Sequence, residues 1–88
     1  NPKPVQITKF TERNGAPSFF PSGASFLYST NRFWPGWDIC RFTFDTSTEV
    51  CVLMGNTSAS KPRVDPTGKQ FVFVAGEGHE LNIAVSPL

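Results

Sequence analysis

The chain has little charge of either sign and few of the side chains from which most metal and catalytic sites are built. Charged residues make up 17% of its 88 residues, the formal net charge is +1, and there are one histidine and two cysteines. Nucleic-acid-binding domains usually carry a clustered basic face, so this balance argues against a nucleic-acid partner. One histidine and scattered carboxylates do not supply a zinc ligand set, and we expect neither a metal nor a cofactor.

Long apolar runs and helix signals are also missing. No apolar run approaches the roughly 20 residues that a transmembrane helix needs, so we expect no membrane span. No stretch of about a dozen residues without glycine or proline places apolar side chains at the i, i+3, i+4 spacing of an amphipathic helix. The nine phenylalanines instead favour β-strands, where aromatic and branched side chains pack well.

Short apolar segments, separated by Gly, Pro, Asp and Ser, predict strands joined by turns. The stretch 55–68 is polar and is predicted to be a long loop, and the stretch between the first two strands an irregular connection. These strands predict an all-β domain: a small antiparallel β-sandwich, immunoglobulin-like or jelly-roll-like, or a small barrel of about six strands. The predicted strands span residues 5–10, 24–29, 37–44, 49–54, 70–74 and 80–86.

The last two predicted strands differ in how their apolar side chains alternate. In the final strand, Leu81, Ile83 and Val85 alternate with other residues, which predicts that these three side chains face the core. The strand before it, residues 70–74, is apolar on both faces. Its second face should therefore be covered by residues 16–21, by a second subunit or by a ligand.

The length fits one domain over residues 1–88, in which the proline-rich residues 1–4 are expected to be the stub of a linker. Aromatic residues make up 14% of the chain, enough apolar surface to predict a folded core rather than a disordered segment. The sequence shows no internal repeat and no low-complexity tract.

The two cysteines, Cys40 and Cys51, fall on the two arms of one predicted hairpin. A two-residue turn at Asp45-Thr46 would make them direct partners, whereas a four-residue turn over 45–48 would offset them by two positions. Either register allows a disulfide, which we predict, although two buried free thiols are the alternative. A disulfide favours an oxidising compartment, so the chain is expected to be secreted or extracellular.

The most distinctive segment is an aromatic turn around Trp34-Pro35-Gly36-Trp37. Pro-Gly predicts a type II turn with positive φ at Gly36, which would bring the two indoles close together. Indole faces stack on the C–H faces of sugar rings, while neighbouring polar groups bond to hydroxyls. In the alternative interpretation, Trp37 begins a core strand and Trp34 covers the end of the sandwich. The predicted ligand-binding residues are Tyr28, Asn31, Arg32, Phe33, Trp34, Trp37 and Asp38.

These features predict a secreted, non-catalytic module that binds a polysaccharide or glycan. No nucleophile-elbow motif is present and His79, the one histidine, lies in a predicted turn, so we expect no enzyme. One alternative is a small secreted inhibitor, toxin or effector that binds a protein partner through the same turn. Another is a structural module whose apolar sheet face is a contact between subunits of a homo-oligomer.

Overall fold

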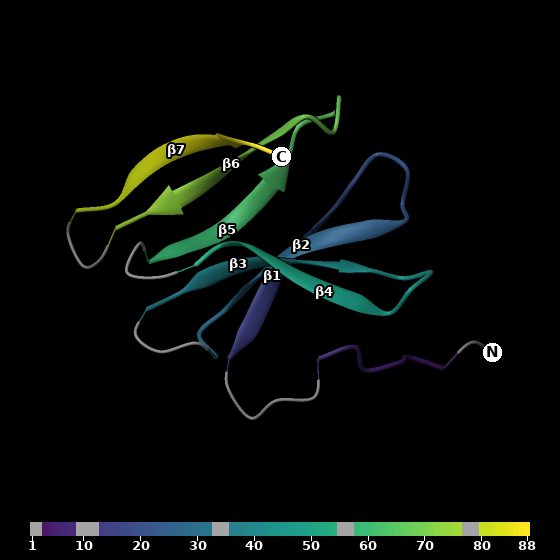
Figure 1. The fold of residues 1–88 in the computed structure, drawn as a ribbon. Helices are drawn as coiled ribbons and strands as arrows, with labels where there is room; N and C mark the ends of the chain where they lie inside the picture. The colour runs from purple at the N-terminus through teal and green to yellow at the C-terminus, as the bar shows by residue number, and fades with distance from the viewer. Residues whose placement is uncertain (1–2, 9–12, 33–35, 55–57, 77–79) are drawn as a thin grey trace.

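The computed structural model describes residues 3–8, 13–32, 36–54, 58–76 and 80–88 (Figure 1). The only regular elements in these residues are antiparallel strands, so the all-β sandwich prediction is confirmed, and none of the residues belongs to a helix that could cross a bilayer. Sheet A has four strands in the order β1-β2-β3-β4, and sheet B has three in the order β5-β6-β7. The strands are β1 (Asn14–Phe19), β2 (Ser25–Thr30), β3 (Asp38–Thr43), β4 (Thr48–Leu53), β5 (Ala59–Val64), β6 (Gln70–Ala75) and β7 (Asn82–Pro87).

Five of the six predicted strands correspond to β2, β3, β4, β6 and β7. The prediction of the first strand is wrong, and so is the prediction that two other stretches contain no strand. Residues 5–8, the described part of the predicted strand 5–10, belong to no strand. Conversely, β1 and β5 lie in stretches predicted to be a connection and a loop. Both strands contain a proline, Pro17 or Pro62, at a register shift. Proline has no N–H to donate to the ladder and is confined to edge strands and bulges. A proline in the sequence therefore argued against a strand at both places.

The core lies between the two sheets. Leu27 and Ile39 of sheet A pack there with Phe71 and Phe73 of sheet B, joined by Phe20 and Ala59. The other face of sheet A is also apolar and carries a second cluster, formed by Phe26, Tyr28 and Cys40, against which Ile7 packs. Residues 3–8 therefore lie on the side of sheet A that faces away from sheet B (Figure 1).

The final strand turns the opposite way from the prediction. Leu81, Ile83 and Val85 are 58%, 75% and 59% exposed, whereas Ala84 packs against the core. Alternation shows that a strand has two different faces, but the neighbouring strand decides which face is inside. Here the large rings of β6 fill the interior, so the small Ala84 fits the inner face.

The disulfide between Cys40 and Cys51 is confirmed, and the two residues are direct partners across β3 and β4. Thr43 pairs with Thr48 at the base of the hairpin. This register corresponds to a two-residue turn at Asp45-Thr46, which is one of the two turns that the sequence allowed.

The strands β1, β2 and β3 of sheet A and β5, β6 and β7 of sheet B repeat one structural unit, although no repeat was predicted from the sequence. The offset is 45 residues, from Pro17 to Pro62, and Ala16 and Lys61 before them both have a φ of 52°. Each first strand has its register shift at this place. A left-handed φ at a residue other than glycine is uncommon, so its recurrence at both positions reflects a shared backbone design.

The turns after these strands repeat as well. In the first turn, Gly23 has a φ of 76° and its N–H donates to the carbonyl of Phe20 at 2.9 Å. In the second, Gly68 has a φ of 73° and its N–H donates to the carbonyl of Asp65 at 2.8 Å. In sequence the two units share only scattered identities, such as Pro17 with Pro62, Gly23 with Gly68 and Phe26 with Phe71, whereas their backbone geometry matches closely.

The turn between β5 and β6 carries a pH-dependent contribution to stability. Asp65 accepts hydrogen bonds from the Thr67 N–H at 3.0 Å and from Gln70 Nε2 at 2.9 Å, and these bonds lower the pKa of its carboxyl. A lowered pKa stabilises the folded state above the unfolded pKa of roughly 3.9, and this contribution is lost as the pH falls through the folded pKa.

We therefore expect the melting temperature of the wild type to fall more steeply below about pH 4 than that of Asp65→Asn. Thermal unfolding of both proteins at neutral pH and in the acid range measures this difference. An equal fall in both proteins would show that Asp65 makes no such contribution.

Candidate functional site

The structure describes only part of the aromatic turn, namely Gly36 and Trp37. Gly36 has the predicted positive φ, 86°, and a Cβ at this position would lie 2.8 Å from Ser58 Oγ. Glycine is therefore required both by backbone conformation and by the close approach of the β4–β5 connection. Phe33, Trp34 and Pro35 lie outside the described residues, so the pairing of the two indoles stays a prediction.

Two of the predicted site residues are buried within sheet A. Tyr28 is 3% exposed and lies in the outer cluster, with its ring centroid 5.6 Å from that of Phe26. Asp38 is fully buried at the start of β3, opposite Thr30 of β2. The structure thus places Tyr28 and Asp38 inside the protein rather than on the ligand-facing side of the turn.

Two others are held by neighbouring residues. Asn31 Oδ1 accepts a hydrogen bond from the Arg13 N–H at 2.8 Å, and the Asn31 N–H donates to the Arg13 carbonyl at 3.1 Å. Arg32 forms an ion pair with Glu49, and its side chain is 10% exposed. Asn31 holds Arg13 beside the end of β2 through these two hydrogen bonds. The ion pair of Arg32 with Glu49 connects the segment after β2 to β4.

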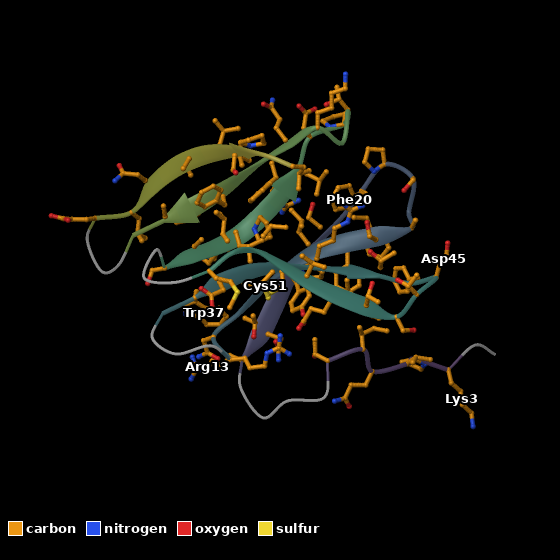
Figure 2. The ribbon with its side chains drawn as sticks, in the orientation of Figure 1. Lys3, Arg13, Phe20, Trp37, Asp45 and Cys51 are labelled. Atoms are coloured by element: carbon orange, nitrogen blue, oxygen red, sulfur yellow. A yellow bond between two sulfur atoms is a disulfide. The ribbon has the colours of Figure 1, made fainter. Side chains whose placement is uncertain are left out.

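Trp37 is the described site residue that lines an open polar hollow, whereas Tyr28 contributes to the wall of an apolar one. Trp37 is half-buried just before β3, and its carbonyl accepts a hydrogen bond from the Ala59 N–H at 2.8 Å, which links the two sheets. The hollow has a volume of about 710 Å³. Figure 2 shows Trp37 and Arg13 at the same end of the molecule. The described residues that line the hollow are Thr8, Arg13, Asn14, Gly15, Ala16, Ser29, Trp37, Ser60 and Lys61.

The two repeated bulges shape this hollow. Ala16 and Lys61, the left-handed residues of the two bulges, both line it. Ser29 Oγ accepts a hydrogen bond from the Lys61 N–H at 2.8 Å and so joins β2 to β5. Bulges redirect side chains and are frequent beside functional sites. These lining residues were not predicted from the sequence, in which the two prolines at the bulges are the available signal.

The lining combines three kinds of group. Trp37 supplies an aromatic surface, Arg13 and Lys61 supply positive charge, and serine, threonine and asparagine side chains supply hydroxyl and amide groups. No carboxylate, histidine or cysteine is among the described residues of the lining. Elsewhere in the described ranges, no three His, Cys, Asp or Glu residues come close enough to hold a metal ion. The arrangement suits hydrogen bonding, stacking and attraction of anionic groups.

A second hollow, of about 470 Å³, lies between residues 3–8 and the outer face of sheet A. Its wall is mostly apolar and includes Phe19, Phe26 and Phe44. The rings of Phe19 and Phe26 stack with centroids 5.6 Å apart, and Phe44 lies 5.6 Å from Phe26. This aromatic surface differs in chemistry from the polar hollow beside Trp37.

Comparisons with known proteins show a fold but no family. No protein-family model matches the chain, and no curated protein matches its sequence. Among solved structures, it is similar to TolB from Acinetobacter baumannii, with a TM-score of 0.77 and 16% sequence identity. The similarity covers 92% of this chain and 20% of TolB, so the chain spans about a fifth of the length of that protein. At this identity, the likeness shows that the two proteins share a fold in this region.

Proposed function

We propose that the chain is a non-catalytic module that binds a glycan in the hollow beside Trp37. The observation that carries the proposal is a half-buried indole on the wall of a hollow whose other described groups are hydroxyls, amides and cations. Sugar rings offer C–H faces for an aromatic surface and hydroxyls for polar partners. Binding sites commonly combine an apolar wall with a few polar groups that fix orientation.

The charges in the hollow favour an acidic glycan. Arg13 and Lys61 are both cationic, and the described lining contains no acidic side chain that would neutralise them. Carboxylate or sulfate groups of a glycan would make charge-assisted hydrogen bonds with these residues. Because both side chains are exposed, we expect added salt to weaken the binding.

Secretion is part of the proposal. The Cys40–Cys51 disulfide is of the kind that persists outside the reducing cytoplasm. An extracellular location would also bring the module into contact with polysaccharides.

The test is retention of the folded chain on immobilised neutral and acidic polysaccharides, compared with two variants. Trp37→Ala removes the aromatic wall, and we expect it to weaken retention about tenfold or more, as loss of a central aromatic contact typically does. The matched control is Phe44→Ala, which removes an exposed ring that lines the other hollow. The control should bind like the wild type, and thermal unfolding of both variants checks that they fold.

Equal retention of wild type and Trp37→Ala would exclude this hollow as the site. Trp34→Ala, tested beside them, asks whether the second indole of the turn contributes, as the sequence predicts. Absence of retention on every polysaccharide would contradict glycan binding itself.

A further inference from the structure

Sheet B has an open edge where sheet A has a strand. In the repeated unit, β7 corresponds to β3 at an offset of 44 residues, one fewer than for the preceding strands: Asp38 pairs with Thr30 in sheet A as Asn82 pairs with Ala75 in sheet B. The far side of β3 is occupied by β4. Within the described part of the chain, the far side of β7 has no strand partner. An open strand edge presents unpaired N–H and C=O groups and can accept another strand.

Residues 3–8 correspond to the strand that sheet B lacks. The 45-residue offset relates Val52 of β4 to Ile7. Val52 packs against the core cluster that contains Phe71 and Phe73, and Ile7 packs against the equivalent cluster on the outer face of sheet A. The N-terminal segment therefore has the same position relative to sheet A that β4 has relative to sheet B.

Each outer face of the molecule also corresponds to an inner face. The outer face of sheet B corresponds to the inner face of sheet A, and the outer face of sheet A corresponds to the inner face of sheet B. Val72 and Ile83, on the outer face of sheet B, correspond to Leu27 and Ile39, which are fully buried where sheet A packs on sheet B. The rings of Phe26 and Tyr28 on the outer face of sheet A correspond to those of Phe71 and Phe73, which receive Leu27 and Ile39. The outer face of sheet B thus has the pattern that packs on a surface like the outer face of sheet A.

We propose that this chain associates head to tail with a second copy of itself. Residues 3–8 of one copy add to β7 of the next as an antiparallel fourth strand, in the place that β4 holds beside β3. The outer face of sheet B in the first copy then packs on the outer face of sheet A in the second, as the two sheets pack within one chain. Main-chain hydrogen bonds supply affinity and the alternating side chains supply specificity.

This contact is heterologous, because two different surfaces of the chain meet. Each copy retains one free surface of each kind, so association continues until a ring closes or a filament grows. A symmetric dimer in which two β7 edges pair with each other would use only one kind of surface and is a different arrangement.

The mass of the full chain in solution, measured by sedimentation velocity over a wide concentration range, tests the proposal. We expect association that depends on concentration, with masses in multiples of 9.7 kDa up to a closed ring or a filament. Ile83→Lys should raise the concentration needed for association about tenfold or more, because it buries an ammonium group in an apolar contact. The matched control is Val50→Lys, at an exposed residue of β4 that belongs to neither of the two outer faces that meet in the proposed contact. This variant should associate like the wild type.

A fluorescent peptide with the sequence of residues 3–8 provides a second measurement. It should bind the wild type, and the same peptide with Ile7→Lys should not. A wild type that is monomeric at every concentration would overturn the proposal. Association unaffected by Ile83→Lys would do the same. Trp37→Ala should leave the mass unchanged, which separates this inference from the proposed glycan site.

Discussion

Replacing Phe71 by alanine is expected to lower the free energy of unfolding by about 3–5 kcal/mol, the usual cost of removing a buried phenylalanine ring. Phe71 is fully buried and packs with Leu27 and Ile39 across the two sheets. Its removal leaves a cavity that neighbouring side chains fill only in part, since they are held by two hydrogen-bonded ladders. Urea denaturation followed by circular dichroism measures the loss.

Leu81→Ala is the informative comparison. The sequence placed Leu81 in the core, whereas the structure leaves it 58% exposed. We expect the free energy of unfolding to change by no more than about 0.5 kcal/mol, as for most surface substitutions. A loss of several kcal/mol for Leu81→Ala, with a small loss for Phe71→Ala, would mean that the faces of sheet B are inverted.

Removing the disulfide is expected to have the next largest effect. The double variant Cys40→Ala, Cys51→Ala should lose roughly 2–3 kcal/mol of unfolding free energy, because the closed loop no longer restricts the unfolded chain. The two residues are direct cross-strand partners in a hairpin whose strands also pair through the backbone, so the native fold should remain.

Reduction of the wild type supplies an independent check on the disulfide. A reducing agent should lower the melting temperature of the wild type towards that of the double variant and leave the double variant unchanged. If the reductant has no effect on either protein, Cys40 and Cys51 are not joined in solution. Such an outcome would also remove the support that the disulfide gives to secretion.

The glycan proposal and the self-association proposal use different surfaces apart from Thr8, which lines the glycan hollow and ends the segment 3–8. The glycan hollow lies where β1, β5 and the segment before β3 meet, whereas the association surfaces are the outer faces and the β7 edge. Both arise from the repeat: its two bulges line the hollow, and among the described residues sheet B has one strand fewer than sheet A, which leaves the β7 edge open. The experiments can therefore succeed or fail independently.

Local sequence determined the elements whose stability depends on near neighbours. The hairpin of β3 and β4, with its disulfide, is set by a short turn between two apolar segments, and both were predicted. Gly36 was predicted to have a positive φ because a Pro-Gly turn imposes it locally. Trp37 was predicted as a site residue from the aromatic turn around Pro35-Gly36, and the structure places it on the wall of the polar hollow.

Tertiary structure decided the features that depend on residues far apart in the chain. The direction in which Ile83 points depends on which strand fills the core beside it, and alternation alone does not contain that information. The strands β1 and β5 form despite Pro17 and Pro62 because each lies at a sheet edge, where a missing donor costs little. The hollow joins Arg13, Trp37 and Lys61 only after the two sheets pack, since hydrogen bonds such as the one from Lys61 to Ser29 hold their strands together.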